Sequence, residues 1–151
     1  MTSDSVAVTV RLTLPLPPGV NNQYVTVGKR RVLSKPAKAF KDEVRTLLLN
    51  HRERNRITAA QERAIKTSYI GVYLTFYFET PLKRDLDGGL KIALDAIAAG
   101  LEFDDRKVVD IHLTKRIDPL RPRLEVELET IADWQFDESY VYLGDDAGEA
   151  E

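Results

Sequence analysis

Carboxylates are concentrated between residues 83 and 110, the stretch of the chain whose residue types could do chemistry. Its 28 residues include seven Asp or Glu and five Lys or Arg. Asp85 and Asp87 precede an apolar run, LKIALDAIAAGLEF, and Asp104 and Asp105 follow it. Carboxylates that converge repel one another, so such a cluster usually holds a cation. Because the chain has no cysteine and only two histidines, oxygen ligands favour Mg²⁺, or Mn²⁺, over Zn²⁺.

Lys91 follows Asp87 by one helical turn, so its ammonium group could contact a phosphoryl oxygen beside such a metal. Sites with two metal ions hydrolyse phosphodiesters by generating hydroxide and stabilising charge on the attacking and leaving oxygens. A lysine would add electrostatic stabilisation. A purely structural interpretation is equally open: Asp85 is the N-cap of a helix, and Asp87 and Lys91 form a surface pair contributing about 0.3 kcal/mol.

The motif RDLDGG has two further interpretations. It resembles the start of an EF-hand loop, but Leu90 and Ala96 stand where that loop needs glycine and glutamate. It also resembles the DxDG motif of haloacid-dehalogenase-like phosphatases, which follows the first strand of a doubly wound sheet. A phosphomonoesterase of that type stays an alternative.

Periodic patterns predict the elements that must position these residues. Alternation predicts strands over residues 6–14, with a slip near Leu12, and over 68–79. A hairpin is predicted over 24–33 with Gly28 at its turn, and a final antiparallel pair over 108–117 and 123–130. Helices are predicted over 35–54 after the N-cap Ser34, over 59–66 after Thr58, and over about 86–99, ending at Gly100.

Length and composition indicate one domain, residues 1–132, followed by an acidic aromatic tail, residues 133–151, that is partly disordered. The tail carries seven acids and no base, whereas residues 1–66 carry 13 bases and five acids, a net charge of +8. A basic half suits a phosphate-bearing partner. Because neither a transmembrane run nor a signal peptide is evident, we expect a cytoplasmic protein with no membrane partner.

The order of several motifs resembles the RusA family of Holliday-junction resolvases. The resemblance covers about residues 12–129 and rests on LPLPPGVNNQY, the basic hairpin and helix, RDLDGGLKIALDAI and FDDRKVVD. It implies an α+β fold, a single small domain with a mixed sheet of about five strands and two main helices. It also implies a homodimer that cleaves four-way DNA junctions with Mg²⁺.

The resemblance further implies roles for individual residues. Asp85, Asp87 and Asp105 match the catalytic carboxylates of the family and would bind the metal with Asp104 beside them, and Lys91 matches its essential lysine. Six bases are expected to bind DNA: Lys29, Arg30, Arg31, Lys38, Lys83 and Arg84. Gly88 stands where the family usually has asparagine, so a non-catalytic junction-binding module on the same scaffold is a second alternative.

A geometric question stays open at this point. The predicted helix of about 14 residues would be about 21 Å long, which separates the two acid clusters. They can meet only if the chain folds back or if a second subunit supplies one of them. The tail could lie over the DNA-binding surface, or it could dock at a dimer interface.

Overall fold

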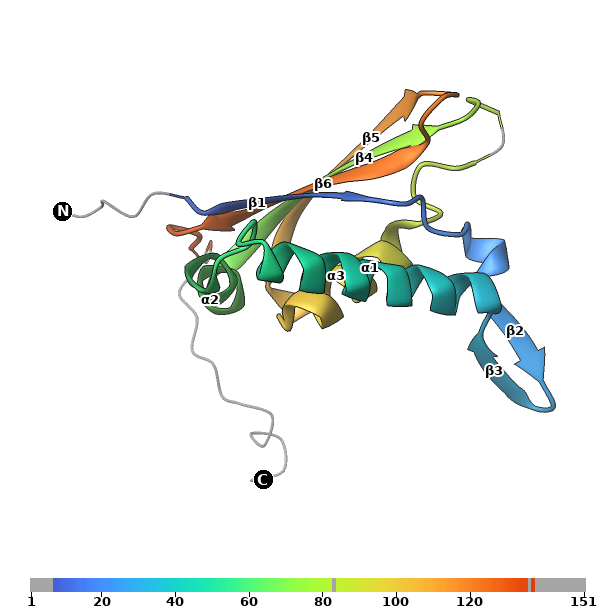
Figure 1. The fold of residues 1–151 in the computed structure, drawn as a ribbon, viewed down its shortest axis with the longest axis horizontal. Coiled ribbons are helices and arrows are strands. Elements are labelled where there is room, and N and C mark those ends of the chain that lie inside the picture. Colours follow the sequence, from blue (N-terminus) through green and yellow to red (C-terminus); the bar gives the residue numbers. More distant parts are fainter. Residues whose placement is uncertain (1–6, 83, 136, 138–151) are drawn as a thin grey trace.

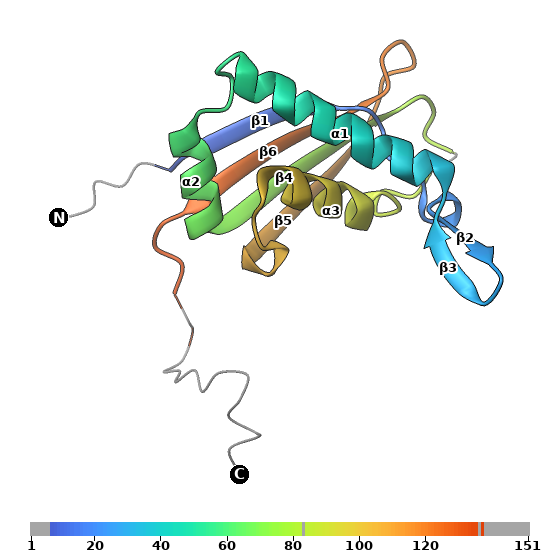
Figure 2. The same ribbon diagram turned by 60° about the horizontal axis from the view of Figure 1, so that its bottom comes forward.

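In a computed structural model, which describes residues 7–82, 84–135 and 137, the chain forms a mixed sheet with helices on one face (Figure 1). The sheet has four strands, and the three α-helices lie together over one of its faces (Figure 2). A separate two-stranded hairpin projects beyond the first turn of the longest helix. The elements in chain order are β1 (Thr9–Leu14), η1 (Val20–Asn22), β2 (Tyr24–Val27), β3 (Arg30–Leu33), α1 (Lys35–Glu53), α2 (Ala59–Thr67), β4 (Tyr69–Phe78), α3 (Leu90–Leu101), η2 (Asp105–Lys107), β5 (Val108–Ile117) and β6 (Arg123–Ile131).

The strand order of the main sheet is β1-β6-β4-β5. The expected α+β class is confirmed, but the expected pairing of the last two strands is wrong. Helix α3 carries the chain back across the sheet, so β5 pairs parallel with β4. β6 then pairs antiparallel with β4 on its other side and with β1. The main sheet therefore has four strands rather than about five, because β2 and β3 pair only with each other.

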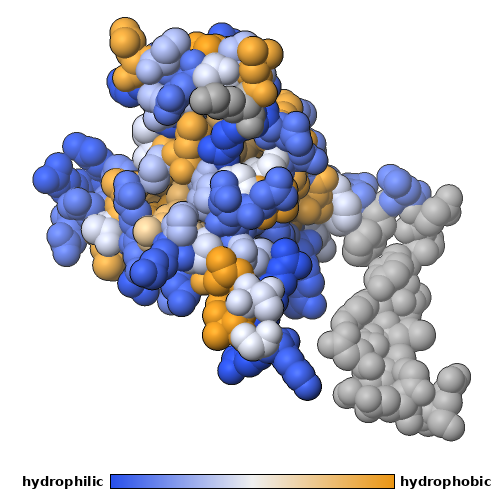
Figure 3. All heavy atoms as spheres, turned by 90° about the vertical axis from the view of Figure 1, so that its right-hand side faces the viewer, coloured by the Kyte–Doolittle hydropathy of each residue, from blue (hydrophilic) through white to orange (hydrophobic). Residues whose placement is uncertain are grey.

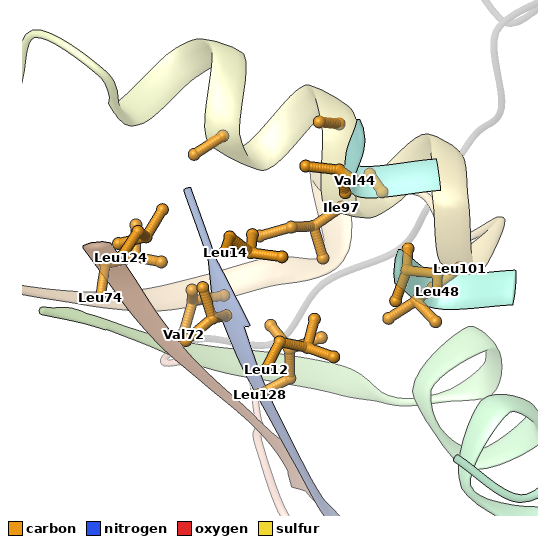
Figure 4. Packing of buried hydrophobic residues seen from close by; sticks show 14 of the residues in the cluster. Leu12, Leu14, Val44, Leu48, Val72, Leu74, Ile97, Leu101, Leu124 and Leu128 are labelled. Carbon is orange, nitrogen blue, oxygen red and sulfur yellow. The ribbon is translucent and has the colours of Figure 1, made fainter. Parts of the chain in front are cut away.

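The apolar faces of the strands form one core with the helices (Figure 4). In β4 the predicted alternation is confirmed, with Ile70 and Val72 completely buried. In β1 the predicted slip is absent, since Val10, Leu12 and Leu14 are all buried and stay in phase. The sheet thus presents a single apolar face to α1 and α3.

Capping side chains define the first two helices as the sequence predicts. The Ser34 hydroxyl accepts a hydrogen bond from the Ala37 amide at the start of α1. Thr58 and Gln61 form a reciprocal capping box at the start of α2.

Helix α3 differs from the prediction at both ends. It begins at Leu90 with Gly89 as the N-cap, so Asp85 is not the N-cap and lies in the turns before the helix. It ends at Leu101, where Glu102 takes a left-handed conformation. Gly100 lies inside the helix, at a position where an added Cβ atom would lie only 2.2 Å from Leu48 Cδ1. This glycine serves close packing of α3 on α1.

None of the helices in the described part of the chain is long and apolar enough to cross a bilayer. Of the aromatic residues of the tail, Trp134 lies against Tyr69 at the start of β4, with ring centroids 4.5 Å apart. Phe136, Tyr140 and Tyr142 lie outside the described residues.

Candidate active site

Hydrogen bonds and close packing hold the RDLDGG motif against the proline-rich turn that follows β1. Gln23, which is only 4% exposed, donates from Nε2 to the carbonyl oxygens of Pro18 at 3.0 Å and Gly88 at 2.8 Å. Gly89 packs so tightly that a Cβ atom there would lie 2.5 Å from Pro17 Cγ. These contacts fix the backbone on which Asp85 and Asp87 stand.

Arg84 makes a second connection to the same turn. Its guanidinium donates to the carbonyl oxygen of Pro17 and lies over the Phe78 ring, 5.2 Å from the centroid. Partial burial lowers the pKa of Arg84. Because these contacts occupy the guanidinium, its role in DNA binding stays a prediction, and Lys83 lies outside the described residues.

The Asp85 and Asp87 side chains are exposed on two successive turns. The Gly88 amide donates to the Asp85 carbonyl and the Leu90 amide to the Asp87 carbonyl, each at 3.2 Å. Asp85 and Gly88 also line a hollow of about 280 Å³ whose other wall is the turn at residues 18–22. Backbone hydrogen bonding therefore shapes these turns and leaves both carboxylates accessible.

Lys91, in the first turn of α3, lies beside Asp105 of the second acid cluster within one subunit. Its Nζ atom donates to Asp95 Oδ1 at 2.9 Å and lies 3.9 Å from Asp105 Oδ2. The hydrogen bond to Asp95 raises the pKa of Lys91, and the charges of Asp95 and Asp105 and a weaker interaction with Tyr24 add to the effect. The chain after α3 folds back, so Asp105 is brought to Lys91 without a second subunit.

Tyr24 contacts the basic hairpin, by which we mean Lys29, Arg30 and Arg31. The Arg31 guanidinium carbon lies 4.7 Å from the centroid of the Tyr24 ring. In Figure 3, which looks onto the hairpin end, the projection at the bottom carries hydrophobic residues along its length and hydrophilic ones at its tip. The hairpin therefore projects from the end of the molecule at which α1 begins (Figure 2).

Asp104 has a different partner from Asp105, because its carboxylate binds Arg106 rather than Lys91. Its carboxylate accepts hydrogen bonds from the Arg106 amide, at 2.9 Å, and from the Arg106 guanidinium. These bonds lower the pKa of Asp104, which is therefore ionised at neutral pH. Asp104 forms the N-cap of η2 and orients the turn that presents Asp105.

The carboxylates of the two acid clusters are suitable ligands for a hard cation, because hard cations prefer oxygen ligands and the chain has no thiol. Among the described residues, however, no three His, Cys, Asp or Glu side chains lie close enough together to hold a metal ion. What the structure brings together is Lys91 with Asp95 and Asp105, while Asp85 lines the hollow beside the proline-rich turn.

Sequence reasoning missed two residues that organise this region. Gln23 lies within the motif LPLPPGVNNQY, and the structure shows that it bridges this turn to RDLDGG. Asp95 lies within the apolar run after RDLDGG, and it is the hydrogen-bond partner of Lys91. The i,i+4 spacing from Lys91 was a usable signal for Asp95, whereas nothing local in the sequence distinguishes Gln23.

A small α+β domain with exposed carboxylates, a lysine between them and a basic hairpin is typical of a protein that acts on phosphodiesters. A model of the Endodeoxyribonuclease RusA family matches residues 15–129, which include these carboxylates, Lys91 and the basic hairpin. The chain therefore belongs to the RusA endodeoxyribonuclease family. Comparison with curated proteins found no relative that matches it.

Proposed function

We propose that this chain is a homodimeric, Mg²⁺-dependent endodeoxyribonuclease that cleaves four-way DNA junctions in recombination and repair. The observation that carries the proposal is the match of the RusA family over residues 15–129, a segment that contains both acid clusters. The domain responsible would be residues 1–132, with residues 133–151 as a separate tail.

The proposed metal ligands are Asp85, Asp87 and Asp105, with Asp104 beside them. Mg²⁺ would supply the charge that activates water and stabilises the phosphoryl oxygens, and Mn²⁺ could replace it. The support for this choice is the all-oxygen donor chemistry and the accessibility of the Asp85 and Asp87 carboxylates.

Lys91 would stabilise the charge that develops on the phosphoryl group. Its raised pKa keeps Nζ protonated at neutral pH, and its exposed side chain can turn from Asp105 towards a bound phosphate. Asp95, one turn along α3, would hold the ammonium group near the site before DNA binds. The contribution of Lys91 is therefore electrostatic and requires no proton transfer.

The basic hairpin, Lys38, Lys83 and Arg84 would bind the DNA backbone. The Lys29, Arg30 and Arg31 side chains are exposed, which leaves them available to phosphates. A dimer would present two such surfaces and two sites, which suits symmetric cleavage of a junction.

A synthetic four-way junction with labelled strands tests this proposal. With Mg²⁺ we expect paired nicks in opposing strands, no cleavage with EDTA, and little cleavage of a linear duplex of matched sequence. Tight junction binding without cleavage would instead support a non-catalytic junction-binding module. This alternative is suggested by Gly88, which stands where the family usually has asparagine.

A phosphomonoesterase of the dehalogenase type fits the fold poorly. Its motif should directly follow a strand of a doubly wound sheet, whereas Asp85 lies seven residues after Phe78 and the only parallel pair in the described sheet is β4 with β5. Hydrolysis of p-nitrophenyl phosphate that is lost in Asp85→Asn, without DNA affinity, would favour that function over ours.

A further inference from the structure

A groove of about 630 Å³ is lined mainly by residues of α1 and α3. Its floor is apolar and includes Ala96, Ala99 and Leu49, whose side chain is 49% exposed. A half-exposed leucine in a groove of this size is apolar surface that a bound segment could cover.

The rim of the groove is basic. Lys38, Lys41, Arg45 and Arg52 line it along one stripe of α1, against two acids, Asp42 and Glu102. Arg45 pairs with Asp42 and Arg52 pairs with Glu62. Within the described part of the chain, neither Lys38 nor Lys41 forms an ion pair, so the rim retains an excess of positive charge.

The tail of the same chain has the complementary chemistry. Residues 138–151 contain five acids and no base, together with the apolar run Tyr140, Val141, Tyr142 and Leu143. This segment lies outside residues 15–129, the part that matches the family. An acidic segment with an apolar centre matches a basic rim around an apolar floor.

The exit of the tail is close to one end of the groove. Trp134 contacts Tyr69, two residues after the end of α2, and Lys66 of α2 pairs at 3.4 Å with Glu102, which lines the groove. Fourteen residues can span up to about 46 Å, whereas α1, with 19 residues, is about 28 Å long. The tail is therefore long enough to follow the whole groove.

We propose that residues 138–151 bind in cis in the groove between α1 and α3. The apolar run covers Leu49 and its neighbours, and the acids lie beside Lys38 and Lys41. Tethering gives the segment a local concentration in the millimolar range, so modest affinity suffices. A tail bound in this way covers the α1 bases, including Lys38, and competes with the DNA backbone for them.

Other occupants fit the groove less well. A DNA backbone would match the bases but would meet the apolar floor and the two acids. The tail of a second copy has the same chemistry but lacks the proximity that Trp134 and Lys66 establish within one chain. The inference does not require the protein to be a nuclease.

Because the natural chain has no cysteine, disulfide trapping can test this contact. In full-length Leu49→Cys/Tyr142→Cys, mild oxidation should give a cross-link within one chain, seen as a faster-migrating species of monomer mass. The matched control is Ala60→Cys/Tyr142→Cys, with the second cysteine on an exposed position of α2 outside the groove. We expect a several-fold higher yield for the groove pair.

Charge provides the second arm of this test. Adding Lys41→Glu to the groove pair, or raising the salt to about 1 M, where the screening length is about 3 Å, should lower the yield to that of the control. Equal yields in the two pairs, no effect of charge, or cross-links only between chains would overturn the proposal. The last of these results would assign the groove to a second copy. None of these readouts depends on DNA cleavage.

Discussion

Gln23 should be the residue on which the arrangement of the site most depends. The substitution Gln23→Glu keeps the size of the side chain but replaces the Nε2 donor by a carboxylate oxygen, which would face the carbonyl oxygens of Pro18 and Gly88. The position is 4% exposed, so water cannot compensate. We therefore expect loss of the bridge between the proline-rich turn and RDLDGG.

The expected cost follows from these two contacts. Each hydrogen bond contributes about 0.5–1.5 kcal/mol, and a buried group left without a partner costs about 1–3 kcal/mol. We expect a loss in the free energy of unfolding of about 2–4 kcal/mol at neutral pH. Burial raises the pKa of the introduced carboxyl, and its protonated form can donate one hydrogen bond, so the loss should shrink as the pH falls.

Urea unfolding checks this result, with the midpoint falling and the slope unchanged. The matched control is Asn21→Ala, an exposed position in the same turn, which should change the free energy of unfolding by less than about 0.5 kcal/mol. If Gln23→Glu unfolded at the wild-type midpoint at neutral pH, the bridge would not hold the two segments together.

Three further outcomes are expected. Gly89→Ala should lower the free energy of unfolding by about 1–3 kcal/mol, because the new Cβ would lie 2.5 Å from Pro17 Cγ. Gly88→Ala should change it little, because its new Cβ would have no neighbour nearer than 3.5 Å among the described residues. Equal urea midpoints for the two variants would contradict the expected difference. Asp104→Asn should destabilise the fold above pH 5, because Arg106 lowers the pKa of Asp104 below its ordinary 3.8 and the ionised form stabilises the folded state. Urea titrations should show that the difference in stability from wild type vanishes as the pH falls through this lowered pKa. A difference that grew in acid would refute the prediction. Replacing the three bases of the basic hairpin by glutamine should reduce the magnitude of the slope of log Kobs for junction binding against log salt by about 2.7, because each neutralised phosphate contributes about 0.9. An unchanged slope would show that the hairpin does not contact the DNA backbone.

The local structure could be predicted from the sequence because its determinants are local. Ser34 and Thr58 are caps that act within one turn of helix, and the alternation in β4 reports burial on one face. The predicted end of α3 is wrong, because a glycine after the last periodic residue usually ends a helix, whereas α3 continues to Leu101. Gly100 is needed instead for contact with Leu48 of another helix, which local sequence does not reveal.

The pairing of β5 shows the same limit at the level of the sheet. The short turn between β5 and β6 favours a hairpin in sequence, but the crossover through α3 places β5 parallel to β4. For the site, the sequence identified the acids and Lys91 by type and spacing. It did not show that Lys91 contacts Asp105, because that contact depends on how the chain turns back after Glu102.

The central claim is that Lys91 and Asp105 belong to one catalytic site. Junction cleavage by Asp105→Asn compared with Asp95→Asn tests it most directly, because both carboxylates contact Lys91 and only Asp105 is proposed to bind the metal. We expect Asp105→Asn to abolish cleavage of the four-way junction while retaining junction binding, and Asp95→Asn to retain most of the cleavage. Equal cleavage by wild type and Asp105→Asn at saturating Mg²⁺ would contradict it.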